Sequence, residues 1–387
     1  MPNEIRFDDV DRWLLDAALP FWLERGVDRR LGGFVEQLTL QGENGAAPFK
    51  RIRAQARQVY CFSHAALLGL APGAAEAADH GWRFLTQHGR RADGAWVRRL
   101  DPAGEVLDAT CDAYDMAFVL FAHAWRYRLD PNSAILASAL STVDALDRVL
   151  AHPNGLGWLA EEGDHGPRQQ NPHMHLIEAT IELADATGHS RFHELGISIA
   201  DLFLNQIMDP DTGAVRELFQ PDWTPLDRPA GRLVEPGHQL EWAWILHHGQ
   251  SLLGLDCGRN ILKLYNSAED VGVDRLTGLT FDQVDVDGAV VTRRSRSWPQ
   301  TEALKANLAV LEGHSIRSLP RIAACVSNLL DRYLAPAPRG AWIDQLDDQG
   351  RPDVDKIPST TFYHILLAFA ELRRLRPQIE GGLGAEA

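Results

Sequence analysis

The sequence predicts an all-α fold in which about twelve helices form six pairs, with short β-hairpin insertions between them. Helical spacing of apolar residues covers most of the chain, and turn-rich insertions separate successive pairs. Polar residues also recur about every 60 positions. A helix-pair repeat of this length builds either an open solenoid or a closed ring. Six pairs favour the ring, with the second helix of each pair on the inside.

Apolar positions such as Val10, Leu14 and Phe21 have helical spacing and predict the first helix at residues 7–24. The other helices are expected at 50–70, 73–88, 111–129, 133–150, 171–187, 190–207, 236–254, 257–272, 299–313, 318–334 and 358–376.

Short strands are expected near 32–40 and 94–100, and extended or turn-rich insertions at 152–169, 209–234, 274–297 and 336–356. A hairpin over 280–292 has Asp287 and Gly288 at its turn. Because no linker rich in Pro, Gly or Ser divides the chain, we expect one domain over residues 1–380. Residues 381–387 are expected to be a disordered tail.

The bulk composition excludes several classes of partner. The net charge of −15 argues against nucleic acids and anionic membranes, since phosphate contacts need a basic surface. No apolar run reaches the length of a membrane helix, and the polar N-terminus lacks the apolar core of a signal peptide. Four widely spaced cysteines predict free thiols in a reducing compartment, so we expect a cytoplasmic protein, monomeric or homodimeric.

The segment 234–248 carries the strongest candidate site. Pro236 suits the first position of a helix, which places His238 in the first turn. Glu241 and Trp242 follow at three and four residues, so both are expected on the same face as His238. An imidazole, a carboxylate and an aromatic ring on one face suit a polyol substrate. The alternative is a surface histidine on an apolar helix.

The same arrangement recurs along the chain. His175 lies three residues after Pro172, Glu302 three after Pro299, and His364 six after Pro358. The interval is 63 residues from His175 to His238, 64 from His238 to Glu302 and 62 from Glu302 to His364. Asp115 and Arg57 continue the series backwards at intervals of 60 and 58. These six positions are therefore expected on the inner helices.

Other polar residues of these helices are further candidates. Arg57 lies in an apolar helical segment, where a buried guanidinium can polarise a carbonyl or an oxyanion. Tyr114 and Asp115 are expected to bind substrate hydroxyls, or alternatively to bond to neighbouring helix ends. His175 pairs with Glu178 at i+3, whereas His173, two residues away from it, must face elsewhere.

Three tryptophans, Trp242, Trp244 and Trp298, are candidates for stacking on a sugar, with simple core packing as the alternative. The sequence has no glycine-rich phosphate loop, nucleophile elbow or dinucleotide fingerprint, and no convincing set of metal ligands. We therefore expect a cofactor-free mechanism without a metal.

The sequence segments around these candidate residues resemble those of the N-acylglucosamine 2-epimerase superfamily, which includes cellobiose 2-epimerases, mannose isomerases and sulfoquinovose isomerases. The resemblance spans Arg53 to Ile365 and is carried by the Arg57 segment and by Asn-Pro-His-Met-His-Leu-Ile-Glu-Ala, Pro-Gly-His-Gln-Leu-Glu-Trp, Trp-Pro-Gln-Thr-Glu and Phe-Tyr-His-Ile. It implies an (α/α)6 barrel. The residues from Arg168 to His175 look most like the bacterial mannose isomerase branch.

The resemblance also implies roles for individual residues. His238 and His364 match the acid/base pair of the family, and Arg57 matches the arginine that assists at the substrate oxygens. The residues that match the lining of the sugar site are His175, Glu241, Trp242 or Trp244, Trp298 and Glu302.

The expected reaction is the interconversion of D-mannose and D-fructose, or of D-lyxose and D-xylulose, through a cis-enediolate. We expect His364 to be the C2 base and His238 to handle ring opening, although these roles can be exchanged. A first-turn position is expected to favour neutral His238. A sugar 2-epimerase of the N-acylglucosamine, glucose or cellobiose type is the alternative. More remote alternatives are a glycoside hydrolase using Glu241 and Glu302, and a sugar-binding protein.

Overall fold

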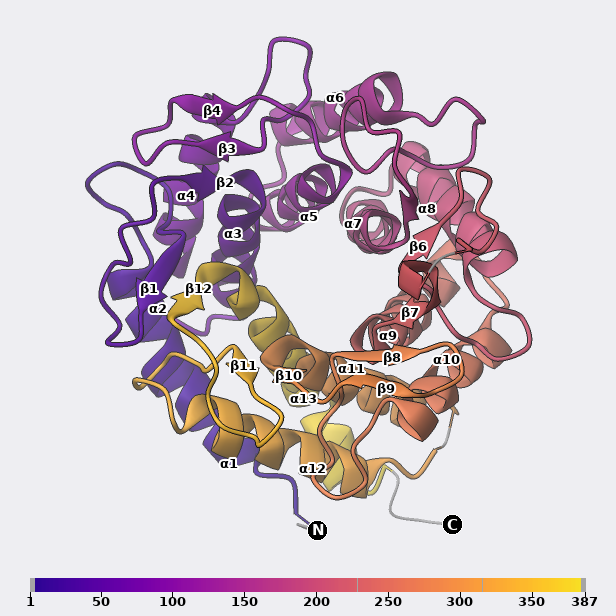
Figure 1. Ribbon diagram of the computed structural model, residues 1–387. Helices are drawn as coiled ribbons and strands as arrows, with labels where there is room; N and C mark the ends of the chain where they lie inside the picture. The colour runs from indigo at the N-terminus through magenta and orange to yellow at the C-terminus, as the bar shows by residue number, and fades with distance from the viewer. Residues whose placement is uncertain (1–3, 228, 315, 384–387) are drawn as a thin grey trace.

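The helices lie in two concentric rings around a central axis in the computed structural model, which describes residues 4–227, 229–314 and 316–383 (Figure 1). The predicted ring of helix pairs is confirmed, with the second helix of each pair inside. The inner helices are α3 (Ile52–Leu67), α5 (Ala113–Leu129), α7 (Asn171–Thr187), α9 (Pro236–Leu253), α11 (Ser297–His314) and α13 (Phe362–Glu380).

The outer ring covers the inner one. Its helices are α1 (Phe7–Trp13), α2 (Leu19–Arg25), α4 (Ala74–His88), α6 (Ser133–Leu150), α8 (Ser190–Leu202), α10 (Gly258–Val271) and α12 (Leu319–Asn328). A π-helical segment, Leu14–Ala18, joins α1 to α2 as one rod, in agreement with the predicted helix at 7–24. Two further π-helical segments, Phe203–Ile207 and Leu329–Leu334, extend α8 and α12.

The inner ring is closed. Each inner helix contacts the next one, and the last, α13, packs against the first, α3. Helix α13 also contacts α1, where Arg376 Nη1 lies 3.2 Å from Asp11 Oδ2 and Arg373 pairs with the same carboxylate. The first and last helices of the barrel are thus joined by packing and by charge.

The two rings differ in the pattern of burial along their helices. Helix α11 is buried on every side from Pro299 to Leu311, because it packs against both rings. Helix α10 instead buries a single stripe, Ile261, Leu264, Tyr265 and Ala268. Such a stripe is typical of a helix with one face in solvent. Polar residues buried on the inner helices are therefore enclosed by protein and need partners there.

Short strands gather at one end of the barrel, in the connections that lead from outer to inner helices (Figure 1). Over the part of the chain that the structure describes, they form five small antiparallel sheets. Their bounds are β1 (Gln37–Thr39), β2 (Lys50–Arg51), β3 (Arg99–Leu100), β4 (Val106–Asp108), β5 (Arg168–Gln169), β6 (Leu218–Phe219), β7 (Leu233–Val234), β8 (Gln283–Asp285), β9 (Val290–Thr292), β10 (Ser295–Arg296), β11 (Gln345–Leu346) and β12 (Lys356–Pro358).

The pairing of these strands links neighbouring connections. Strand β1 pairs with β12, with Gln37 opposite Pro358, so that the first and last connections also meet. The predicted hairpin over 280–292 is present as β8 and β9, with Gly288 at a φ of 84° in its turn. Glycine suits this turn because other residues rarely adopt positive φ.

Helix α9 begins at Pro236, as predicted, and ends at Leu253, where Gly254 follows with a φ of 66° as the common glycine stop. The predicted start of the last helix is wrong: Pro358 belongs to β12, and a 3-10 turn at Ser359–Thr361 precedes α13. Within the described residues no helix is long and apolar enough to cross a membrane. The expected tail at 381–387 lies largely outside the described residues.

Candidate active site

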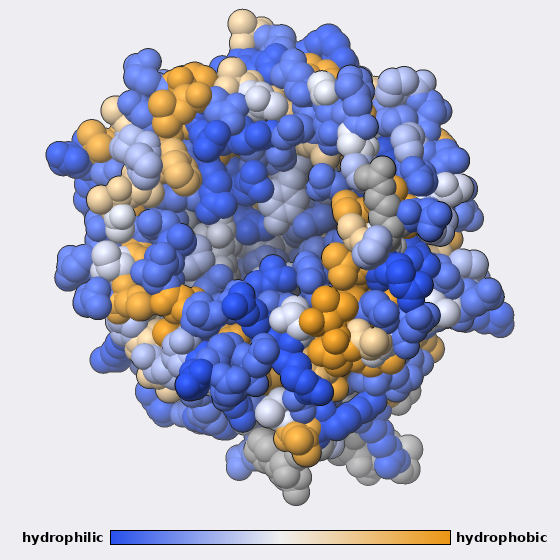
Figure 2. Space-filling model, viewed as in Figure 1, coloured by the Kyte–Doolittle hydropathy of each residue, from blue (hydrophilic) through white to orange (hydrophobic). Residues whose placement is uncertain are grey.

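A cavity of about 590 Å³ opens at the end of the barrel that carries the strands. Figure 2 shows this face of the molecule hollowed at its centre, with hydrophilic residues around the hollow. The volume lies in the range of small-molecule sites. All six inner helices contribute to its lining, through Arg57, Tyr114, Asn171, His175, His238, Glu241, Trp298 and His364.

The indole of Trp298 lies between the two predicted acid/base histidines. Its ring centroid is 5.0 Å from that of His238 and 5.6 Å from that of His364. The close approach depends on Gly237, where an added Cβ would lie 2.7 Å from the Trp298 ring. A glycine before His238 therefore lets α9 and α11 bring this indole and both imidazoles into one cavity.

His238, in the first turn of α9, is held by two neighbouring carboxylates. Its Nδ1 donates to Glu217, with distances of 2.9 and 3.0 Å to the two carboxylate oxygens, and Glu235 Oε2 lies 3.9 Å away. Burial disfavours the charged ring, but Glu217, Glu235 and Glu241 outweigh it and raise the pKa of His238 to about 9. The expectation of a neutral His238 is therefore wrong, because these charges are stronger than the effect of the helix terminus.

His364 is in the opposite state. Burial lowers the pKa of its imidazole well below the usual value, and the positive charges of Arg57 and Lys305 lower it further. Its Nδ1 lies 2.8 Å from Glu302 Oε1, so Nδ1 carries the proton and donates to the carboxylate. Nε2 is then left unprotonated, as a proton acceptor needs to be.

A cationic and aromatic wall completes the cavity. Arg57 Nη2 donates to the Tyr114 hydroxyl at 2.7 Å, and the guanidinium lies 3.9 Å from the centroid of the Phe118 ring. His175 Nδ1 lies 3.1 Å from Glu178 Oε2, as the spacing predicted. His173 points elsewhere and accepts from the amide of Trp158, which confirms that the two histidines face different ways.

Glu241 contributes a buried carboxyl group. Both of its oxygens are enclosed and have no hydrogen-bond partner among the described residues. Burial, reinforced by the charge of Glu302, raises the pKa of Glu241 well above its ordinary value. A carboxyl group at this position can accept a hydrogen bond from a sugar hydroxyl, and it can also donate one when it is protonated.

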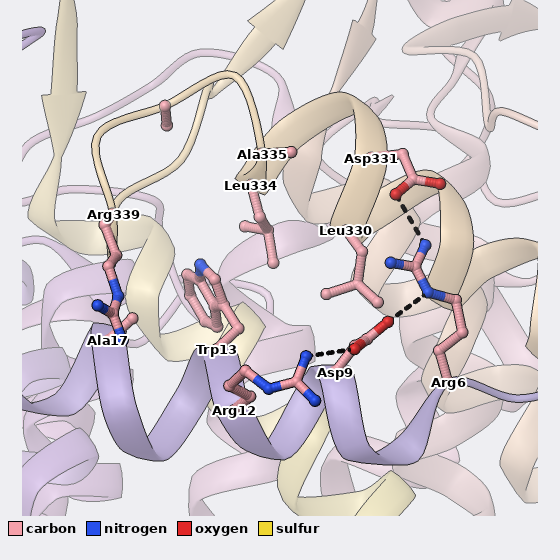
Figure 3. Close-up of a pocket in the computed structure, with 11 residues that line it drawn as sticks. Arg6, Asp9, Arg12, Trp13, Ala17, Leu330, Asp331, Leu334, Ala335 and Arg339 are labelled. Atoms are coloured by element: carbon pink, nitrogen blue, oxygen red, sulfur yellow. Dashed lines mark hydrogen bonds and ion pairs between the residues drawn. The ribbon is translucent and has the colours of Figure 1, made fainter.

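A second groove lies on the outer ring, between α1 and the π-helical segment after α12 (Figure 3). Arg6 bridges Asp9 and Asp331 there, each at 2.7 Å, and Arg12 Nη1 lies 2.7 Å from Asp9. Its carboxylates are thus already paired with arginines, and no histidine is among its lining residues. We therefore assign the chemistry to the central cavity.

Residues 32–368 match the family model described as N-acylglucosamine 2-epimerase (GlcNAc 2-epimerase). The chain belongs to the N-acylglucosamine 2-epimerase family. The resemblance read from the sequence blocks is thereby confirmed, and so is the expectation of an enzyme.

Within this family, the chain is 34% identical to a mannose-6-phosphate isomerase from Rhizobium meliloti (strain 1021), over 96% of this chain and 98% of the relative. It is 28% identical to a D-mannose isomerase from Thermobifida fusca, over the same shares of the two chains. The fold matches the solved cellobiose 2-epimerase from Bacillus thermoamylovorans B4167 with a TM-score of 0.87, at 18% identity and over 95% and 98% of the two chains. The predicted (α/α)6 barrel is confirmed.

Four of the predicted site residues of this epimerase-family enzyme do not line the cavity. Trp242 is fully buried, stacks on Phe203 of the outer ring at 3.7 Å between centroids, and donates to Gln170 Oε1 at 2.7 Å. It therefore does not take the expected place in the lining of the sugar site. Asp115 is also fully buried, with Arg53 Nε 2.7 Å from its carboxylate. Trp244 and Glu302 lie behind the lining, each close to Lys305.

Sequence reasoning missed Glu217, the partner of His238, and Lys305, the partner of Glu302. Glu217 lies in the connection before β6, where no periodicity indicates the direction of a side chain. Lys305 had a readable signal. It follows Glu302 by three residues inside the apolar run Ala303-Leu-Lys-Ala306, so it shares a buried helix face with that carboxylate.

Proposed function

We propose that this enzyme is an aldose–ketose isomerase that interconverts free D-mannose and D-fructose through a cis-enediolate, without a cofactor. The observation that carries the proposal is the opposite protonation of two histidines beside one indole: His364 is neutral and His238 is charged. A neutral base and a charged acid in one cavity suit proton transfer at carbon next to a carbonyl.

The roles follow from these states. His238 donates the proton on Nε2 to the ring oxygen as the C1–O5 bond breaks, and the O1 hydroxyl loses its proton to water, so the pyranose opens to the C1 carbonyl. Solvent then returns a proton to His238. His364 Nε2 then removes the C2 proton, and the electron pair moves through C2–C1 to the carbonyl oxygen to give the enediolate. The Arg57 guanidinium stabilises that oxyanion. When His364 returns the proton to C1 and the O2 proton passes to O1, the product is the ketose.

Mannose is proposed as the sugar because the two relatives reported above are named mannose-6-phosphate isomerase and D-mannose isomerase. We favour the free sugar over its phosphate, since the arginines at the mouth of the cavity already have partners. Arg296 lies 2.9 Å from Glu235 and 3.0 Å from Asp282, and Arg51 pairs with Glu36. A phosphate would have to displace these carboxylates.

A 2-epimerase is the second candidate, because the same histidines can serve it. Charged His238 can deliver a proton to the face of C2 opposite His364, which returns an epimeric aldose. The remote alternative of an inverting hydrolase has less support: Glu302 is fully buried behind His364, so it is poorly placed to activate a water.

The deciding experiment is NMR of the purified enzyme with D-mannose in D₂O, without added cofactor. Fructose supports the isomerase, with deuterium at C1 if the base exchanges its proton with solvent. Glucose with deuterium at C2 would assign a 2-epimerase instead. A parallel reaction with D-mannose 6-phosphate tests the preference for the free sugar, which fails if the phosphate is the better substrate by kcat/KM.

The same proposal covers the setting of the enzyme. Cys61, Cys111, Cys257 and Cys325 are buried free thiols, which supports a reducing compartment such as the cytoplasm. We further propose that residues 1–380 form one catalytic domain, acting as a monomer or homodimer. Size-exclusion chromatography with light scattering distinguishes these two states.

A further inference from the structure

A lysine is buried directly beneath the candidate active site. Lys305 lies one helical turn after Glu302 on α11, and its side chain is fully enclosed. Its Nζ is 2.7 Å from Glu302 Oε2, in a contact ion pair, and 4.1 Å from the centroid of the Trp244 ring. An isolated ammonium in such surroundings is costly, so its charge must be balanced locally.

Carboxyl groups provide this balance. Burial lowers the pKa of Lys305, but Glu302, Glu241 and Glu178 outweigh burial and raise it, so the amine is charged at neutral pH. Burial in turn raises the pKa of all three glutamates, that of Glu178 to about 7 and that of Glu241 well above its usual value. The pKa of Glu302 is raised by burial as well, and Lys305 is the main group that opposes this rise. One carboxylate has to neutralise the ammonium, and Glu302, in direct contact, is that group.

The pair continues to the reacting base. Glu302 uses Oε2 for Lys305 and Oε1 for His364 Nδ1, at 2.8 Å. An ionised Glu302 can only accept from this ring nitrogen, which fixes the tautomer with Nε2 unprotonated. A protonated Glu302 could instead donate to Nδ1 and turn the ring into the wrong tautomer. The chain from Lys305 through Glu302 to His364 therefore decides the state of the base.

We propose that Lys305 is a positioning residue for catalysis: its buried ammonium keeps Glu302 ionised, and Glu302 holds His364 ready to accept a proton at Nε2. The inference deepens the proposed function and rests on it for the role of His364. Lys305 itself does not touch the cavity, since it is absent from the lining residues.

The electrostatic surroundings of His364 give the sign of the expected effect. Around the ring lie Arg57 from α3, His175 from α7, His238 and Glu241 from α9, and both Lys305 and Glu302 from α11. Removing the Lys305 charge withdraws one of the positive groups that disfavour the imidazolium. The pair of Glu302 and His364 then takes up a proton at higher pH than in the wild type. Whether that proton lies on the ring or on the carboxylate, Nε2 is no longer the free acceptor, and the base is lost over a wider acid range.

The test compares Lys305→Met, Glu302→Gln and the double variant. We expect kcat to fall roughly 10- to 100-fold in each, as for other groups that orient a catalytic residue, with KM little changed. The acid limb of the kcat profile should move to higher pH in Lys305→Met. Because Lys305 acts through Glu302, the double variant should be no slower than Glu302→Gln. Additive losses, or an unmoved acid limb in a folded Lys305→Met, would overturn the proposal.

A matched control separates positioning from stability. Lys50 is also buried and lies 2.9 Å from a carboxylate, Asp28, but outside the cavity. Lys50→Met should lower the melting temperature without moving the pH profile. If Lys305→Met shows that same pattern, Lys305 is merely structural and the proposal is wrong.

Two NMR measurements test the proposal even if the enzyme shows no turnover, and the first needs only the wild type, so it does not depend on the folding of a variant. The chain has four lysines, so ¹⁵N-lysine NMR of the wild type resolves the state of Lys305. An ammonium that persists to about pH 10 or above is expected, and an amine at pH 7 refutes the proposal. Imidazole ¹³C shifts report the pKa of His364 in unliganded wild type and Lys305→Met. If the wild type does not isomerise the sugar but the pKa of His364 is higher in Lys305→Met than in the wild type, the proposed reaction is refuted and the positioning role is supported.

Discussion

The charge of His238 gives the sharpest prediction. The pKa of about 9 exceeds the ordinary 6.5 by an amount equivalent to about 3 kcal/mol of preference for the protonated ring, at 1.36 kcal/mol per pH unit. Glu217 makes the closest carboxylate contacts to this ring, at 2.9 and 3.0 Å. We therefore choose Glu217→Gln, which keeps the shape of the side chain and removes its charge.

The expected result is a shift of the alkaline limb of kcat/KM. In the wild type the acid His238 stays protonated up to about pH 9, so activity falls only above that pH. Without the Glu217 charge, the burial of the ring is opposed mainly by Glu235 and Glu241. The limb should then move down by about two pH units, within the roughly one to three units that one close opposite charge supplies. Activity at pH 6 should change much less than activity at pH 8.

Stability provides an independent check with a defined sign. Since folding raises the pKa of His238, the protonated ring stabilises the folded state, and this contribution to the free energy of unfolding is fully present below pH 6.5. It is lost as pH rises from about 6.5 to 9. Urea titrations should therefore show a larger fall between pH 6 and 9 for the wild type than for Glu217→Gln.

The assay is initial-rate isomerisation from pH 5 to 10, with Glu105→Gln, an exposed residue far from the cavity, as the control. The control should follow the wild type at every pH. If the alkaline limb of Glu217→Gln stays where the wild-type limb is, His238 is not the acid or Glu217 does not set its charge, and the reasoning fails.

Four further outcomes are expected. His364→Ala should lower kcat by about 10²–10⁴-fold, the usual contribution of a general base, and near-normal turnover would remove His364 from the mechanism. Trp298→Ala should weaken sugar binding, measured as KM, with a modest loss of stability. Trp242→Ala should instead destabilise the fold by about 3–5 kcal/mol in urea unfolding, because its stack on Phe203 is lost, while folded protein keeps its KM. EDTA should leave activity unchanged, since an ammonium already balances the buried glutamates; full loss restored by a divalent ion would contradict this.

Much of the architecture was determined by the sequence itself. The interval of about 60 residues between polar positions indicates one supersecondary unit per repeat, and a proline marks the start of the inner helices α7 and α9. These two signals placed His175, His238, Glu302 and His364 on neighbouring inner helices before any coordinates. Local spacing was enough to predict which side chains share a helix face, because the i, i+3 and i+4 geometry is a property of the helix alone.

The protonation of the site was decided only by tertiary structure. The charge on His238 depends on Glu217, which lies 21 residues earlier in a connection without periodicity, so helix spacing does not relate the two side chains. The direction of Trp242 was likewise set by packing, since Phe203 from another helix supplies its stacking partner. A pKa responds to burial and to every charge within a few ångströms, and these neighbours come from several helices that only the closed ring brings together. The sequence by itself thus determines which residues can react, and the fold determines which of them hold the protons.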